Sequence, residues 1–184
     1  MAAIQLKNRR LFIILSRTDT FLAKVIRYFT KARYNHVSLS LDPTLNQMYS
    51  FGRRYPHNPL WGGFVKESKN GGFFKLCREA EVTVLSVAID EETYKNIMYH
   101  LQYMNEHRFS YHYNYLGLFF AIFNIHFKPT SHTYFCSEFA KEILIYHNIE
   151  GASVLKEVPK PMHFLSIPNT TEIYTGKLTH YDAA

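Results

Sequence analysis

The chain has 184 residues, a length that fits one domain with a full hydrophobic core. Hydrophobic residues make up 47% of it and charged residues 20%, a balance that excludes an intrinsically disordered chain. The formal net charge is +6, but the basic residues are scattered in ones and twos, without a nucleic-acid-binding motif. We therefore expect a single domain over residues 1–184 and no specific nucleic-acid partner.

The apolar runs of the sequence are too short to cross a bilayer. The longest are 11–15 and 116–123, whereas a spanning helix needs about 20 residues. The first residues lack the small-residue cleavage site of a signal peptide, and two cysteines do not make a disulfide scaffold. We expect no transmembrane segment and a cytoplasmic protein with thiol cysteines, whose oligomeric state stays open.

A strand and a helix are predicted at the start of the chain. Residues 10–16 contain a short, β-rich apolar run with polar residues at both ends, which is typical of a buried strand. Thr18 and Asp19 are suited to cap a helix from about 20 to 30, where aromatic and aliphatic residues recur at helical spacing. This helix is expected to pack on the sheet.

A β-hairpin is predicted next. Residues 35–41 alternate between polar and apolar side chains, which places His36 on one face with two serines. An Asp-Pro pair ends this strand, and residues 47–53 resume an extended pattern. The segment 52–75 then contains five glycines and two prolines, which predicts irregular structure or a mobile covering loop.

The second half of the chain shows clearer patterns. Residues 81–89 predict a strand, and Asp90 is placed to cap a helix that runs to about His107. A further helix is expected from about Asn114, and a late edge strand over 172–178. Between them, a helix begins at Cys136, and its apolar stripe continues at Phe139, Ala140, Ile143 and Leu144.

Cys136 is the better placed of the two cysteines for chemistry. A thiol reacts as its thiolate, which a helix N-terminus or a nearby imidazolium favours. Cys77 precedes a strand, with no predicted helix N-terminus beneath it, so an inert thiol is expected there. Taken alone, Cys136 is also compatible with a small core residue, and His36 with an imidazole satisfied by neighbouring hydroxyls.

Two short motifs, one around His36 and one around Cys136, point to a known family. Tyr34-Asn35-His36-Val37-Ser38 and, far downstream, Tyr134-Phe135-Cys136-Ser137-Glu138-Phe139 resemble the His and Cys motifs of circularly permuted papain-like enzymes of the NlpC superfamily, including YiiX-like and lecithin retinol acyltransferase-like proteins. In ordinary papain-like chains the cysteine precedes the histidine. The resemblance implies an α+β fold, in which an antiparallel sheet or open barrel packs against the helix that starts at the cysteine.

The resemblance also implies roles for individual residues. By position, Cys136 corresponds to the nucleophile and His36 to the general base. Relatives supply a third polar residue soon after the histidine, and here the second hairpin arm offers Gln47, Tyr49 and Ser50. Hairpin register favours Ser50, while an ordinary strand hydroxyl, with a backbone carbonyl or water orienting His36, stays open.

Two tyrosines and one backbone group complete the expected site. The backbone N–H of Cys136 points towards a carbonyl that its own sulfur attacks, and the Tyr34 hydroxyl is a second candidate donor to an oxyanion. Tyr113 is expected to line the substrate pocket, although packing in the core is equally compatible with a tyrosine there. Cys136, His36 and Ser50 are thus the predicted catalytic residues, and Tyr34 and Tyr113 the predicted substrate-binding residues.

The predicted function is a thiol hydrolase or acyl transferase that acts on an amide (peptide or lipid amide) or ester bond through an acyl-enzyme. A small molecule, peptide or lipid is the expected substrate, and no cofactor is expected. The alternative is a catalytically inactive module of the same fold that binds a ligand or partner. Metal binding is not expected, because no CxxC, HxH or HExxH spacing occurs.

Overall fold

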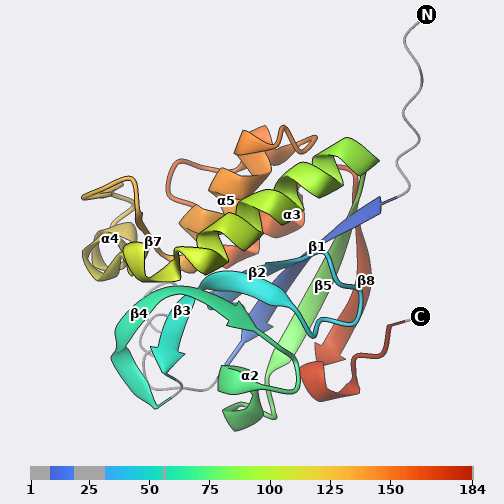
Figure 1. Cartoon of the computed structure of the whole chain (residues 1–184), viewed down its shortest axis with the longest axis horizontal. Helices are drawn as coiled ribbons and strands as arrows, with labels where there is room; N and C mark the ends of the chain where they lie inside the picture. Colours follow the sequence, from blue (N-terminus) through green and yellow to red (C-terminus); the bar gives the residue numbers. More distant parts are fainter. Residues whose placement is uncertain (1–8, 19–31, 56, 184) are drawn as a thin grey trace, which may run out of the picture.

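The computed structural model describes residues 9–18, 32–55 and 57–183, which form a mixed α+β fold on one open sheet (Figure 1). The strands in the sheet are β1 (Arg9–Arg17), β2 (His36–Ser40), β3 (Met48–Tyr55), β4 (Asn58–Glu67), β5 (Glu81–Ile89), β6 (His112–Tyr113), β7 (Thr133–Tyr134) and β8 (Thr170–Lys177). They lie in the order β7-β6-β4-β3-β2-β1-β5-β8, and every neighbouring pair is antiparallel except β6 and β7.

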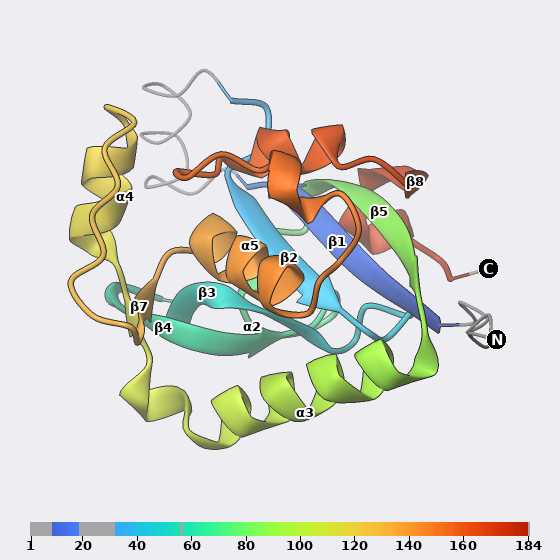
Figure 2. The same ribbon diagram turned by 90° about the horizontal axis from the view of Figure 1, so that it is seen from above.

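The helices lie mainly on one side of this sheet. They are α2 (Gly72–Leu76), α3 (Glu91–Glu106), α4 (Tyr115–Ala121) and α5 (Cys136–Tyr146). Figure 2 shows α5 lying across β2 and β3, with α3 running along the same side of the molecule. Short 3-10 turns follow α3 (Arg108–Ser110) and α5 (Ala152–Val154, Pro161–Ser166), and another follows β8 (Leu178–His180).

The main core lies between α5 and the sheet. The stripe of α5 is buried as its spacing predicts, and Phe139 packs its ring against Phe51 of β3, with ring centroids 5.3 Å apart. Ile143 and Leu144 continue the contact, and both are fully buried or nearly so. Burying each such side chain contributes roughly 1.5–3 kcal/mol. This packing fixes the position of the first residue of α5.

β1 is buried on both faces, as its continuous apolar run predicts. Leu11, Ile13 and Leu15 belong to the core beneath α5, whereas Phe12 and Ile14 point to the opposite face. There they meet a second cluster that includes residues of α2 and of the carboxyl-terminal segment. The strand predicted over residues 10–16 is therefore confirmed.

Most other predicted elements are found within one or two residues of their expected bounds. β5 spans the predicted residues, and Asp90 caps α3 by accepting a hydrogen bond from the Thr93 backbone N–H at 2.7 Å. Asn114 caps α4 by accepting one from the Gly117 N–H, and β8 forms the predicted late edge strand. The helix predicted over 20–30 lies outside the described residues.

The prediction of an irregular covering loop over residues 52–75 is wrong. The centre of this segment is the 10-residue strand β4, which pairs with β3 from Met48 to Tyr55. Two of the glycines that suggested a loop, Gly62 and Gly63, are needed inside the sheet instead. A Cβ on Gly62 would lie 2.6 Å from the Tyr115 hydroxyl, and one on Gly63 would meet the Tyr111 carbonyl oxygen and the Arg54 guanidinium.

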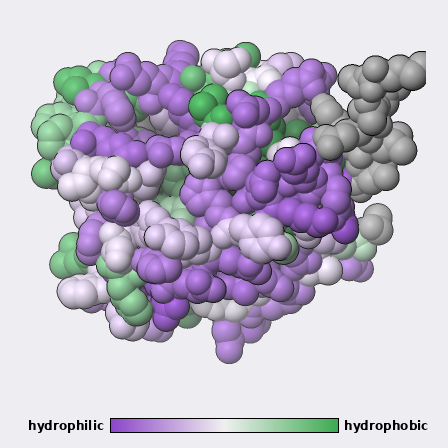
Figure 3. Space-filling view, turned by 45° about the horizontal axis from the view of Figure 1, so that its top comes forward, coloured by the Kyte–Doolittle hydropathy of each residue, from purple (hydrophilic) through white to green (hydrophobic). Residues whose placement is uncertain are grey.

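One helix contributes little to the core. Of the residues of α4, only Gly117 and Ala121 are buried, and its large apolar side chains are mostly exposed. In Figure 3, hydrophobic residues gather at the left edge of the molecule, on the side where α4 lies in Figure 1. No helix among the described residues is long and apolar enough to span a bilayer.

Candidate functional site

His36 begins β2, and its neighbours fix how the chain enters that strand. The Asn35 backbone N–H donates to the Ser16 carbonyl at 3.0 Å, and the Asn35 side-chain amide donates to the Thr18 carbonyl at 3.0 Å. These bonds tie the residue before His36 to the end of β1. The His36 side chain is 14% exposed, so the imidazole is mostly shielded from water.

A carboxylate that the sequence analysis did not single out contacts the imidazole. Both carboxylate oxygens of Glu67, the last residue of β4, lie 3.2 Å from His36 Nε2. The Ser38 hydroxyl donates to the same carboxylate at 2.7 Å. Glu67 is only 7% exposed, so these two side chains replace much of the water that an ionised carboxylate requires.

A glycine on β3, Gly52, leaves room for the contact between Glu67 and His36. β3 lies between β2 and β4 in the sheet, so the Glu67 side chain must reach past it to meet His36. A Cβ on Gly52 would be 3.7 Å from both the Glu67 Oε1 and the His36 Cε1 atoms. Gly52 is therefore a residue of β3 that faces the side chains of both Glu67 and His36.

Cys136 is held at the start of α5 by a network around Glu138. The Phe135 backbone N–H donates to the Glu138 carboxylate at 3.0 Å, which is half of a capping box. The Asn114 side-chain amide also donates to Glu138, at 3.4 Å, and burial raises the pKa of that carboxyl. Ser137 adds a bond from its hydroxyl to the Pro159 carbonyl at 2.7 Å.

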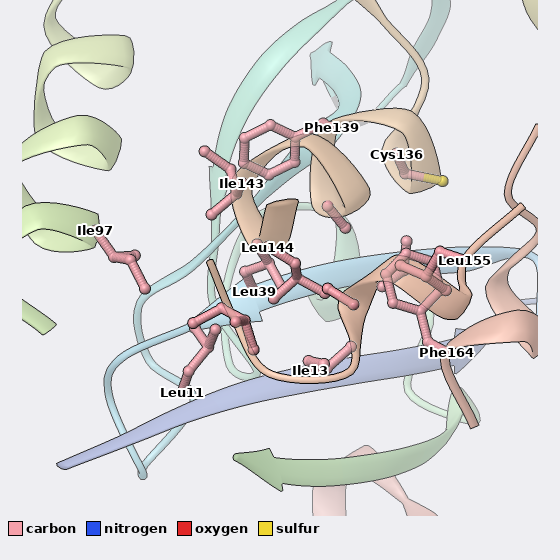
Figure 4. Close-up of a cluster of buried hydrophobic side chains, with 14 of the residues drawn as sticks. Leu11, Ile13, Leu39, Ile97, Cys136, Phe139, Ile143, Leu144, Leu155 and Phe164 are labelled. Atoms are coloured by element: carbon pink, nitrogen blue, oxygen red, sulfur yellow. The ribbon is translucent and has the colours of Figure 1, made fainter. Parts of the chain in front are cut away.

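The Cys136 side chain lies close enough to His36 to raise the pKa of the imidazole. In Figure 4, the Cys136 sulfur lies at the end of α5 and points away from Phe139 and Ile143. Burial disfavours the protonated imidazole, but the Glu67 carboxylate and Cys136 outweigh it and raise the pKa of His36 to about 10. Because Nε2 faces Glu67, Nδ1 is the ring nitrogen left for the thiol.

The structure brings one further predicted residue to this cluster. Tyr113 lies on β6, and its ring contacts that of Tyr115 in a tilted arrangement, with centroids 4.7 Å apart. Burial, together with the neighbouring Cys136 side chain, holds the pKa of Tyr113 well above its usual value. Tyr113 thus lies close enough to Cys136 for the cysteine side chain to affect the pKa of the tyrosine.

The other two predicted residues are engaged elsewhere. The Ser50 hydroxyl donates to the Val37 carbonyl at 2.6 Å, so it acts as a strand hydroxyl, and Glu67 takes the position beside the imidazole. The Tyr34 hydroxyl shares a hydrogen bond with the Thr83 hydroxyl at 2.6 Å, and the side chain is 1% exposed. Donating to a substrate would require Tyr34 to give up this buried bond.

Glu67 was missed because its strand was interpreted as a loop. The signal was present in residues 63–67, which alternate in side-chain size and end in Glu67 just before a Ser-Lys-Asn-Gly-Gly turn. The role of Asn114 was only partly foreseen. The sequence predicts a helix from about Asn114, but neither its capping bond to Gly117 nor its bond to Glu138 was predicted.

A cleft adjoins the Glu67 side of the cluster. It has a volume of about 660 Å³, and its lining includes Glu67, Phe73 and four basic side chains, namely Arg53, Arg54, Lys66 and Arg108. Over residues 9–18, 32–55 and 57–183, no group of three or more His, Cys, Asp or Glu side chains is arranged to hold a metal ion.

Comparison of the chain with protein-family models, with curated proteins and with solved structures finds no match. The candidate site is therefore defined by its geometry.

Proposed function

We propose that this chain is a cysteine-dependent hydrolase or acyl transferase that acts on an amide or ester bond. In this proposal Cys136 is the nucleophile, His36 is the general base and Glu67 orients the imidazole. The observation that carries it is the placement of His36 between a buried carboxylate and the only cysteine at the start of a described helix. Nucleophile, base and orienting group are the three parts that thiol catalysis requires.

The contact with Glu67 selects the useful tautomer of the base. A carboxylate accepts hydrogen bonds only, so Nε2 must carry a proton towards Glu67. Nδ1 then holds the proton that the Cys136 thiol gives up, because His36, with a pKa of about 10, is an imidazolium at neutral pH. Because the Glu67 charge is buried beside the ring, it also stabilises the imidazolium that this transfer forms.

The reaction follows from these positions. His36 already holds the proton that the Cys136 thiol has given up, and the thiolate sulfur attacks the substrate carbonyl carbon. His36 then passes this proton to the leaving amine or alcohol as its bond to the carbonyl breaks, which leaves a thioester on Cys136. Water or another acceptor attacks the thioester while the neutral His36 takes its proton, and the Cys136 sulfur leaves as the thiolate beside the imidazolium.

The start of α5 supplies stabilisation for the negative charge. The first backbone N–H groups of a helix have no partner within the helix, and the helix dipole places partial positive charge there. Cys136 is the first residue of α5, so its own N–H is suited to bind the oxyanion of the tetrahedral intermediate. This role does not require the Tyr34 hydroxyl.

The finer assignment of the fold is part of the same proposal. A His on a strand that precedes, in sequence, a Cys at the start of a helix packed on an antiparallel sheet supports the permuted papain-like fold. The order β2, β3, β4 and then α5 agrees with it. The described geometry supplies the support, since the comparisons found no match.

Acylation by a small activated ester tests the proposal without knowledge of the natural substrate. Incubation with p-nitrophenyl acetate should place one acetyl group on Cys136, detected by peptide mass spectrometry, with release of p-nitrophenolate. Cys136→Ala should abolish the adduct, and His36→Ala should slow its formation by about 100-fold or more. Cys77→Ala is the control and should behave as the original protein.

Acetylation spread over Cys77 and lysines, with no effect of His36→Ala, would overturn this proposal. A module that has kept the fold and lost turnover gives that result, and the 5% exposure of Cys136 is the observation that favours it. The peptide-level readout separates the two, because it measures the site of acylation as well as its rate.

A further inference from the structure

The helix α4 and the turn after it expose an unusual amount of apolar surface. Leu116, Phe119 and Phe123 are 60%, 58% and 62% exposed, and Ile125 is 52% exposed. Phe119 and Phe123 lie side by side, with ring centroids 5.7 Å apart. We call this group of exposed side chains the apolar ridge; hydrophobic residues gather at the edge of the molecule where α4 lies (Figure 3).

The first residues of β4 add further exposed apolar side chains near the start of α4. Leu60 is 81% exposed and Trp61, the single tryptophan of the chain, is 56% exposed. The next residue, Gly62, lies against the Tyr115 hydroxyl at the start of α4. We call these exposed residues the aromatic surface; it comprises Leu60, Trp61, Tyr115, Leu116, Phe119 and Phe123.

Basic side chains lie next to the aromatic surface. Arg53 and Arg54 lie close enough to Tyr115 to favour its ionised form, although burial of that side chain outweighs them. The segments that contribute to the surface, residues 43–66 and 107–137, contain five lysines and arginines, of which Lys128 is paired with Glu142. A partner with negative charge next to apolar material is complementary to this arrangement.

We propose that the aromatic surface docks this protein on the surface of an anionic lipid bilayer. Aromatic side chains are favoured at the boundary between headgroups and hydrocarbon, and nearby basic residues are attracted to anionic lipids. The aromatic surface combines a short helix with the start of β4, which meet where Gly62 lies against the Tyr115 hydroxyl. Docking does not depend on chemistry at Cys136.

Trp61 provides a direct probe of this docking. Vesicles of phosphatidylcholine and phosphatidylglycerol should shift Trp61 emission to shorter wavelength and sediment the protein, and phosphatidylcholine vesicles should do so much less. Raising the salt concentration should weaken binding, because it screens the attraction of Arg53 and Arg54 to the lipid. Cys136→Ala should bind as the original protein does, which separates this proposal from the proposed function.

A double variant tests the surface itself. Phe119→Ser with Phe123→Ser should weaken partitioning into the anionic vesicles by roughly tenfold or more, because two exposed aromatic rings are lost. The control is Tyr99→Ser with Ile173→Ser, which removes exposed side chains from α3 and β8 and should leave binding unchanged. Thermal melts establish that both variants are folded.

Three results would overturn the docking proposal. They are no binding to anionic vesicles, equal binding by the Phe119→Ser, Phe123→Ser variant, and a dimer in gel filtration that only this variant breaks. The last result would assign the aromatic surface to a second copy of the chain.

Discussion

The contact between His36 and Glu67 is the feature on which the proposed chemistry depends most. Taking a carboxylate out of water is costly unless hydrogen bonds replace its hydration, and here the imidazole and the Ser38 hydroxyl do so. Both carboxylate oxygens of Glu67 contact the same ring nitrogen of His36, Nε2, so Nδ1 is left for Cys136. Glu67 is thus a positioning residue that acts through His36.

Replacing Glu67 with glutamine should separate this role from simple packing. Glu67→Gln keeps the shape of the side chain and one acceptor oxygen but removes the charge, so the imidazolium loses its stabilisation. We expect acylation of Cys136 to slow by about 10- to 100-fold, with a changed dependence of the rate on pH and a similar melting temperature. The measurement is p-nitrophenolate release across a pH series.

Ser50→Ala is the matched control for this prediction. Its hydroxyl donates to the Val37 carbonyl rather than to the imidazole, so the loss should change the acylation rate by less than about twofold. A larger loss in Ser50→Ala than in Glu67→Gln would restore Ser50 as the residue that orients His36.

At the scale of single residues, the sequence predicts the base and the nucleophile of the proposed site but not the residue that orients the base. His36 and Cys136 are recognisable because a strand pattern and a helix start place them locally. The partner of His36 depends on which residue of another strand reaches it in space. Hairpin register suggested Ser50, but Glu67 reaches past β3 because Gly52 has no side chain to block it.

Among the elements, β3 is the strand that makes the site possible. It lies between the strands that carry His36 and Glu67, so its own side chains decide whether those two residues can meet. A Cβ on Gly52 fits, since its contacts with Val65, Glu67 and His36 would be 3.5 to 3.7 Å. A longer side chain at that position does not have such space.

Two substitutions of Gly52 should therefore differ sharply. Gly52→Ala should fold and react as the original protein, because its Cβ makes ordinary van der Waals contacts. Gly52→Leu should cost about 1–3 kcal/mol of stability and slow acylation strongly, because the added atoms separate Glu67 from His36. Denaturant unfolding and p-nitrophenolate release measure the two effects. Equal rates in both variants would show that Gly52 does not control the contact.

Helices and strands with a regular apolar period were predictable from the sequence. The glycine-containing strand β4 was not. β1, β5, α3 and α5 have uniform apolar patterns and clear caps, so their positions follow from local rules. The glycines of β4 are required by neighbours distant in sequence, such as Tyr115. Their purpose becomes visible only once the strands are paired.

In the whole molecule, the aromatic surface and the candidate site are joined by a short path. The chain passes from α4 through β7 to Cys136 at the start of α5. Asn114, which caps α4, donates both to the Phe127 carbonyl and to the Glu138 carboxylate that holds the start of α5. A bilayer that binds the aromatic surface would therefore hold the candidate site at a fixed position near the lipid.

The central claim is that His36 activates Cys136, and the two cysteines of the intact protein allow it to be tested directly. Iodoacetamide labelling followed by peptide mass spectrometry gives the rate at each cysteine across a pH series, with Cys77 as the internal reference. His36 has a pKa of about 10 and stays protonated at pH values below it, so an imidazolium is present to stabilise the Cys136 thiolate.

We predict that at about pH 6, well below the free-thiol pKa of about 8.5, Cys136 reacts at least about tenfold faster than Cys77, and that His36→Ala removes this advantage. Cys136 labelling that is no faster than Cys77 labelling at that pH, or that is unchanged in His36→Ala, would contradict the account.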